Sequence, residues 1–177
     1  RREHKPHSFT CFLACADALV DQGWAAADRV AAEGGSAGGL LVAAAATQAP
    51  ARFRAVLAQV PFVDVLTTML DPSLPLTITE QQEWGDPIAD PAAYDLIASY
   101  SPYETVPVGD FPALLITTSA NDTRVFVTEP AKWMARLRDR VTDDPVCRPL
   151  LMRTQLTSGH GGRSVRCQAW REIAWEW

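Results

Sequence analysis

A serine between glycines is the first feature of the sequence that could carry out chemistry. The segment Gly34-Gly35-Ser36-Ala37-Gly38 matches the pattern G-x-S-x-G. In a sharp turn from a strand into a helix, this pattern exposes the serine hydroxyl as a nucleophile, and the next backbone N–H faces a developing oxyanion. The flanking glycines are expected because side chains beside so tight a turn would clash. The segment therefore predicts Ser36 as nucleophile and Ala37 as oxyanion donor.

Two phosphate-binding interpretations of the same segment fail on spacing. A P-loop requires Gly-Lys-Ser/Thr after its first glycine, and no such tripeptide follows here. A dinucleotide fingerprint requires G-x-G-x-x-G, which the segment does not match either. A purely structural turn before a helix stays open on this segment alone.

A serine hydroxyl needs a base, and the sequence offers one histidine in the order that α/β-hydrolases use, which is nucleophile, acid, histidine. This is His160, in a glycine-rich stretch, whereas the other two histidines precede the serine. Asp122 follows an apolar run and is the candidate acid that orients the imidazole. Taken singly, Asp122 fits a turn cap and His160 a solvated loop residue. Together, each beyond an expected strand, they predict a triad with Ser36.

The elements that must position these residues follow from hydrophobic periodicity. A 3.6-residue period predicts an amphipathic helix over residues 8–22, capped by Ser8 or Thr10 and stopped at Gly23. The further expected elements are, in order, a strand over 28–32, a helix over 40–48, a strand over 55–60, short helical pieces near 63–70 and 92–99, a strand over 113–118, a helix over 130–140, a strand over 149–154 and a helix from 163 to the end. This alternation implies an α/β fold with a mostly parallel sheet and helices on both faces.

Composition suits a folded enzyme and argues against other classes. The 177 residues are 47% hydrophobic and carry a net charge of −5, which disfavours a nucleic-acid partner. No apolar run reaches the roughly 20 residues of a membrane helix, and no secretory signal opens the chain. We expect four buried, reduced cysteines and a cytoplasmic location, with no metal or organic cofactor. The cysteines are Cys11, Cys15, Cys147 and Cys167.

Six strings spread over almost the whole chain carry a resemblance to a known family. They are GGSAGGLL from residue 34, QVPFVDV from 59, EWG from 83, YSPY from 100, EPAKW from 129 and SGHGG from 158. With them the sequence resembles the oligopeptidase B group of the prolyl oligopeptidase family of serine peptidases. The resemblance implies an α/β-hydrolase fold, a triad of Ser36, Asp122 and His160, and cleavage of short peptides after Arg or Lys.

The resemblance also implies which residues bind the basic side chain. Two acidic positions before the E-W-G string do so in the family; the first matches Glu80 and the second falls on Gln82, which is a departure. A cation facing one carboxylate and one amide is held less well than one facing two carboxylates, by about 1–3 kcal/mol. The preference for basic substrates is therefore expected to be less strict. Glu83 is a candidate to compensate, and the alternative for Glu80 is a solvated loop acid.

The same resemblance implies that residues 1–177 are the C-terminal portion of a catalytic domain. The family's N-terminal β-propeller, its first sheet strands and the tyrosine that gives a second oxyanion donor have no counterpart in the chain. The charged start at Arg1 and the helical end at Trp177 predict truncation at both ends. The alternatives are another α/β-hydrolase, such as an esterase, and a catalytically inactive fragment. The oligomeric state is not predicted.

Overall fold

The centre of the molecule is a parallel sheet. The computed structural model describes residues 1–142, 144–162 and 166–177. Its four strands are all parallel and follow one another in chain order. They are β1 (Ala31–Gly35), β2 (Ala55–Gln59), β3 (Ala113–Ser119) and β4 (Leu150–Gln155). Because the strands are parallel, their carboxyl ends lie at one edge, and the loops that follow β1, β3 and β4 meet there.

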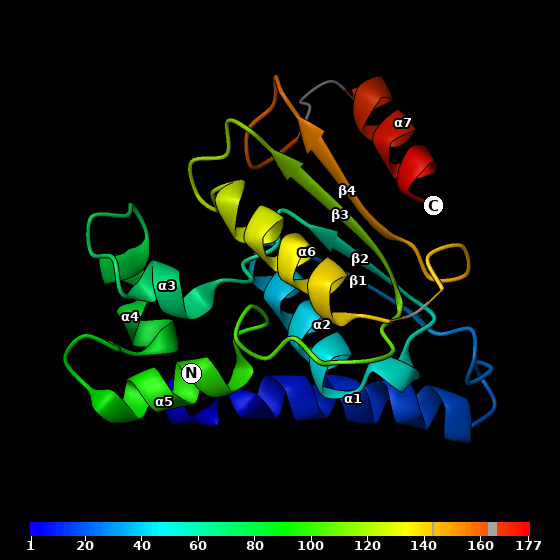
Figure 1. Cartoon of the computed structure of the whole chain (residues 1–177), viewed down its shortest axis with the longest axis horizontal. Coiled ribbons are helices and arrows are strands. Elements are labelled where there is room, and N and C mark those ends of the chain that lie inside the picture. The colour runs from blue at the N-terminus through cyan, green and yellow to red at the C-terminus, as the bar shows by residue number, and fades with distance from the viewer. Residues whose placement is uncertain (143, 163–165) are drawn as a thin grey trace.

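Helices cover both faces of the sheet, which confirms the predicted α/β architecture (Figure 1). One face packs against three helices through a cluster that includes Val56, Ile116 and Trp133. On the other face Gln59 donates to Glu176 of the last helix at 2.8 Å. The three helices are α1 (Pro6–Asp21), α2 (Ala37–Gln48) and α6 (Thr128–Arg140), and the last helix is α7 (Arg166–Glu176).

A layer of three short helices lies between β2 and β3 in the chain, beside the sheet in Figure 1. The helices are α3 (Val65–Met69), α4 (Thr77–Trp84) and α5 (Pro91–Tyr100). They enclose a second core that includes Phe62, Trp84 and Tyr100. The sequence predicted α3 and α5 but not α4. Its segment TITEQQEW has little apolar periodicity, and burial of its two ends, Thr77 and Trp84, holds it in place.

The first helix differs from its prediction at one end. It begins two residues early, at Pro6, whose missing N–H is harmless in a first turn. Neither Ser8 nor Thr10 caps it, because both lie inside the helix, and the N-cap residue is Lys5 without a side-chain cap bond. At the other end Gly23 has φ 76°, which confirms the predicted left-handed stop.

Two element boundaries next to the glycine motif also differ from their predicted positions. The first strand spans Ala31–Gly35 rather than 28–32, so two glycines of the motif belong to it. The following helix begins at Ala37 rather than 40, which leaves Ser36 alone in the turn. The predicted start of the last helix, residue 163, lies outside the described residues; α7 is described from Arg166.

The prediction of buried cysteines is wrong, because all four are exposed and unpaired. On α1 the buried residues are Phe9 and Ala16. Cys11 stands two residues after Phe9, about 200° around the helix, so it faces away from the core, and Cys15 follows it one turn later. Their thiols therefore lie on the polar side of an amphipathic helix.

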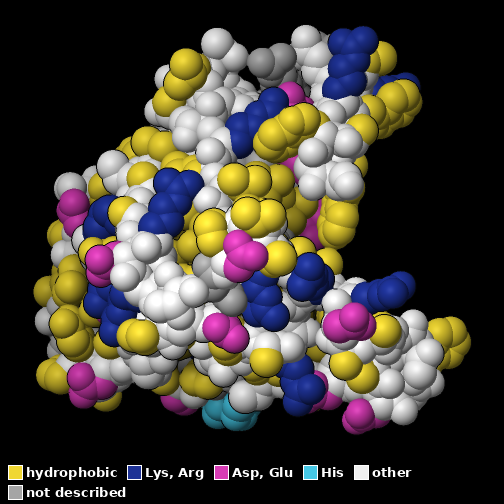
Figure 2. Space-filling view, turned by 45° about the vertical axis from the view of Figure 1, so that its right-hand side comes forward, with side chains coloured by type: hydrophobic (Ala, Val, Ile, Leu, Met, Phe, Trp, Pro, Cys, Tyr) yellow, Lys and Arg dark blue, Asp and Glu magenta, His cyan; other side chains and the backbone are white. Residues whose placement is uncertain are grey.

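The surface mixes charged and hydrophobic side chains. Acidic and basic groups alternate over the face seen in Figure 2, and hydrophobic side chains reach the surface between them. Several large exposed side chains belong to the last helix and its end, among them Trp170, Ile173 and Trp177. In the part of the chain that the structure describes, no helix has the length and apolar character needed to span a membrane.

Candidate active site

Ser36 forms the whole turn between β1 and α2. Its backbone has φ 57° and ψ −119°, a conformation that costs a non-glycine residue about 1–3 kcal/mol. Backbone hydrogen bonds hold it there: its N–H donates to Gln59 at 2.9 Å, and its carbonyl accepts from Leu40 and Phe62, both at 3.1 Å. The strained turn raises the hydroxyl above the carboxyl edge of the sheet. Ala37 is the first residue of α2, so its N–H has no acceptor within the helix.

Glycine is required at two places around this turn. A Cβ added at Gly34 would lie 2.2 Å from the carbonyl oxygen of Gly38, and one at Gly39 would lie 2.7 Å from Cα of Pro61. A Cβ at Gly38 would meet nothing within 4 Å. The prediction that a side chain would clash is therefore confirmed at Gly34 and wrong at Gly38. Gly38 contributes to the clash only through its backbone carbonyl, which an added Cβ at Gly34 would strike.

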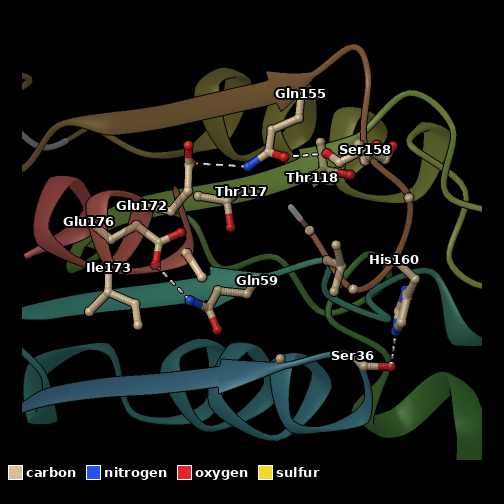
Figure 3. A pocket seen from close by; sticks show the side chains of 17 residues that line it. Ser36, Gln59, Thr117, Thr118, Gln155, Ser158, His160, Glu172, Ile173 and Glu176 are labelled. Carbon is tan, nitrogen blue, oxygen red and sulfur yellow. Dashed lines mark hydrogen bonds between the residues drawn. The ribbon is translucent and has the colours of Figure 1, made fainter. Parts of the chain in front are cut away.

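Three side chains from three separate loops meet at the carboxyl edge. Nε2 of His160 lies 3.1 Å from Oγ of Ser36, a contact seen in Figure 3, and Nδ1 lies 2.7 Å from Oδ2 of Asp122. The other oxygen of Asp122 accepts from the N–H groups of Arg124 and Val125 at 2.9 and 3.0 Å. An ionised Asp122 keeps the proton on Nδ1, so Nε2 is free to accept the proton of Ser36.

The acid loop and the histidine loop are tied together. The Ser119 hydroxyl donates to the carbonyl of Ser158, which joins the end of β3 to the histidine loop. The Ser158 hydroxyl bonds to Gln155, whose amide donates to Glu172 of α7 at 3.1 Å (Figure 3). Asp122 and His160 are thus carried by loops that hydrogen bonds connect to each other and to the last helix.

Two hollows border Ser36. The larger, about 360 Å³, lies between the sheet and α7 and includes Gln59, Glu172 and Glu176 (Figure 3). Its carboxylates already have partners, because Glu172 pairs with Arg153 at 2.9 Å and Glu176 accepts from Gln59. This hollow does not include Ala37 among its lining residues.

The second hollow, about 40 Å³, borders both Ser36 and Ala37. Its wall is made by Phe62, Thr68, Met69 and Thr77, with Glu80 and Arg124 as its charged members. A further depression of about 380 Å³ shares Ala37 and Glu80 with it and runs along α4. We call this second hollow the side-chain cavity.

The structure brings Glu80 to the side-chain cavity but not Gln82. Both residues lie on α4 rather than in a loop. Glu80 lines the cavity together with Ser36, and its Oε2 accepts from Nε1 of Trp84 at 2.7 Å. Gln82 lines only the neighbouring depression along α4. One carboxylate therefore faces the cavity directly.

Glu83 is already engaged by two cations. Its carboxylate lies 2.7 Å from the Lys5 ammonium and 3.1 Å from the Arg1 guanidinium. The hydrogen bond from Lys5 lowers the pKa of Glu83. The Lys5 ammonium also lies 4.0 Å from the centre of the Trp84 ring. Glu83 thus fixes the first residues of the chain to α4 instead of facing the cavity.

Sequence reasoning missed part of the cavity wall. Thr68 and Met69 lie on α3, whose helical character was predicted without any role for its side chains. Arg124 lies two residues after Asp122 in the same loop. Its charge so near the candidate acid could have indicated that it lines the site. Among the described residues, no group of three His, Cys, Asp or Glu side chains is arranged to hold a metal ion.

The parallel sheet, the strained serine turn and the histidine and aspartate loops at one edge define an α/β-hydrolase fold. The model of the prolyl oligopeptidase family matches residues 1–177, and the chain belongs to this family.

Two curated relatives are each 47% identical to the chain. One is the dipeptidyl aminopeptidase BI of Pseudoxanthomonas mexicana, matched over 97% of this chain and 23% of the relative. Another is protease 2 of Moraxella lacunata, matched over 98% of this chain and 25% of the relative. A solved structure, oligopeptidase B from Leishmania major, superposes with a TM-score of 0.92 at 39% identity, over 98% of this chain and 24% of that one. The chain thus spans about a quarter of the length of these relatives.

Proposed function

We propose that these residues form the catalytic part of a serine peptidase that hydrolyses short peptides through an acyl-enzyme. The observation that carries the proposal is the hydrogen-bond chain from Ser36 through His160 to Asp122, at 3.1 and 2.7 Å. The names of the relatives support it. So does a further similar structure, oligopeptidase B from Trypanosoma brucei with antipain covalently bound, which is 44% identical over 87% of this chain.

The geometry suits the following steps. Oγ of Ser36 attacks the peptide carbonyl carbon while Nε2 of His160 takes the hydroxyl proton. The carbonyl oxygen becomes an oxyanion and accepts a hydrogen bond from the Ala37 N–H, at the positive end of α2. Asp122 stabilises the imidazolium that forms. The C–N bond then breaks, and His160 gives its proton to the leaving amine. Water, deprotonated by His160, releases the acyl group from Ser36 in a second pass through the same steps.

Cleavage after Arg or Lys is the specificity that the cavity supports. A long cationic side chain entering beside Ser36 would meet Glu80 at the wall. Gln82 stands off the cavity and Glu83 is held by Lys5, so neither adds a second carboxylate there. We therefore propose a basic preference resting on one carboxylate, weaker than a pair would give.

We further propose that the chain is the C-terminal portion of a catalytic domain within a longer protein that carries an N-terminal β-propeller. Its span of about a quarter of its relatives supports this. We propose a cytoplasmic location, in keeping with four free thiols.

A fluorophosphonate probe tests the nucleophile in the full-length protein that carries this chain. It should label wild-type protein at Ser36 and fail to label S36A. Ser99→Ala is a matched control, because Ser99 is exposed on α5 and should leave labelling unchanged. Labelling that survives in S36A would refute the role of Ser36.

Amidomethylcoumarin substrates with Arg, Lys or Pro before the scissile bond test specificity. We expect the Arg and Lys substrates to be preferred and Glu80→Gln to raise their KM. An unchanged KM in that variant would remove Glu80 from the binding site. A protein that hydrolyses ester substrates but none of the three amidomethylcoumarin amides would be an esterase instead.

A further inference from the structure

Glu129 is a buried carboxylate that the triad does not use. It lies in the first turn of α6, the helix that follows the Asp122 loop, and its exposed fraction is 5%. Its two oxygens reach across to the start of α3. Oε2 accepts from the backbone N–H of Asp64 at 3.1 Å, and Oε1 accepts from the Thr68 hydroxyl at 2.7 Å. One side chain therefore fixes α3 to α6.

The residue that Glu129 holds is part of the side-chain cavity. Thr68 lines that cavity, and its carbonyl accepts from the hydroxyl of Thr77 at 2.9 Å. Thr77 is fully buried and opens α4, which carries Glu80 one turn later. A continuous set of hydrogen bonds thus runs from Glu129 through Thr68 to the helix that presents Glu80.

Among the described residues, no cation forms an ion pair with Glu129. The Lys132 ammonium bonds to Asp64 and lies 4.6 Å from the centre of the Tyr103 ring, and Arg136 lies 4.8 Å from the same ring. Burial raises the pKa of Glu129 to about 7, and the negative charge of Asp64 acts in the same direction. Glu104, also in this cluster, has its pKa raised by burial.

We propose that Glu129 is a positioning residue for recognition of the substrate side chain: its ionised carboxylate holds α3, and loss of that charge loosens the side-chain cavity while leaving the triad in place. This inference rests on the proposed peptidase function. An ionised carboxylate accepts both hydrogen bonds at full strength. A protonated one, or an amide, accepts less strongly from the Asp64 N–H and must donate to the Thr68 hydroxyl instead of accepting from it.

The consequence is a pH dependence of selectivity. Ser36, Asp122 and His160 would act on every substrate alike, so their contribution cancels in the ratio of kcat/KM for an Arg substrate to kcat/KM for an Ala substrate. Glu129 affects only the substrate whose side chain fills the cavity. The ratio in the full-length wild-type protein should therefore rise as the pH passes about 7. We expect a rise of about fivefold, the size of one weakened hydrogen bond.

The test compares Glu129→Gln with Glu104→Gln. The first variant should show the low ratio at every pH near neutrality, whereas the second keeps the wild-type rise, because Glu104 bonds to Ser101 rather than to α3. The rate of fluorophosphonate labelling of Ser36 should match wild type in both, which shows that the triad is intact.

Each outcome decides the matter. A wild-type rise in E129Q, or an equal loss in E104Q, overturns the role of Glu129. If E129Q fails to fold, Thr68→Val removes the same hydrogen bond from the other side; it should give the low, level ratio, and a wild-type rise in T68V overturns the proposal. Folded wild-type protein that cleaves neither substrate and is not labelled at Ser36 refutes the peptidase function instead.

Discussion

Stability of the catalytic region should depend on pH through Glu129. Its pKa is raised from 4.5 to about 7 by burial, so the folded protein binds this proton more tightly than the unfolded chain does. A group of this kind contributes stability that is fully present below the unfolded value of 4.5 and is lost as the pH rises through about 7. Glu129→Gln cannot ionise. The difference in free energy of unfolding between wild type and E129Q must then change across this window.

The size of that change follows from the two pKa values. Each unit of pKa difference corresponds to 1.36 kcal/mol between the two protonation states, and most of the window lies between about pH 5 and about pH 8. Wild type should therefore lose about 2–3 kcal/mol relative to E129Q over this range. The difference should shift in favour of E129Q as the pH rises, because its amide never carries a charge in the buried site.

Hydrogen exchange measured by mass spectrometry reports this pH-dependent change in stability for individual segments of the full-length protein. Segments covering α3 and α6 report openings that carry Glu129 into water, a different change from the loosening of α3 around a carboxyl that stays buried. Asp95→Asn is the control, because Asp95 is exposed on α5 and its removal involves no buried charge. A difference between wild type and E129Q that stays constant with pH would refute the reasoning, since it would mean that Glu129 has the same affinity for its proton in both states.

Three further predictions concern the triad, the serine turn and the cavity. Asp122→Asn should lower kcat by about 10³- to 10⁴-fold without unfolding the protein, because the amide favours the wrong tautomer of His160; steady-state kinetics and circular dichroism check it. Gly34→Ala should destabilise the protein by about 3 kcal/mol because its Cβ would lie 2.2 Å from the Gly38 carbonyl, whereas Gly38→Ala should change stability by less than about 1 kcal/mol in thermal unfolding. Gln82→Glu should leave KM for Arg substrates within about twofold, since Gln82 does not line the cavity beside Ser36; a tenfold fall in KM would place it in the binding site.

That Ser36, Asp122 and His160 lie close together could be predicted, because their placement depends on chain order and strand ends alone. Each of Ser36, Asp122 and His160 follows a strand, and parallel strands bring their carboxyl ends to one edge. The side-chain cavity could not be predicted in the same way. Its wall comes from α3 and α4, which are held by contacts between residues far apart in the chain, such as Thr68 with Glu129. Local pattern carries no information about such pairs.

Glu83 shows most clearly why an acidic residue near a site in the sequence need not contribute a free carboxylate to that site. By sequence it is a candidate to compensate for Gln82, and it lies three positions from Glu80 on the same short helix. The fold decides between them, because the Lys5 ammonium pairs with Glu83 at 2.7 Å and lies 4.0 Å from the centre of the Trp84 ring. Trp84 in turn donates to Glu80, so the ring that contacts the Lys5 ammonium also orients the Glu80 carboxylate. The position of Glu80, the carboxylate proposed to bind a basic side chain, depends on both ends of α4: on Lys5 through Trp84, and on Glu129 through Thr68 and Thr77.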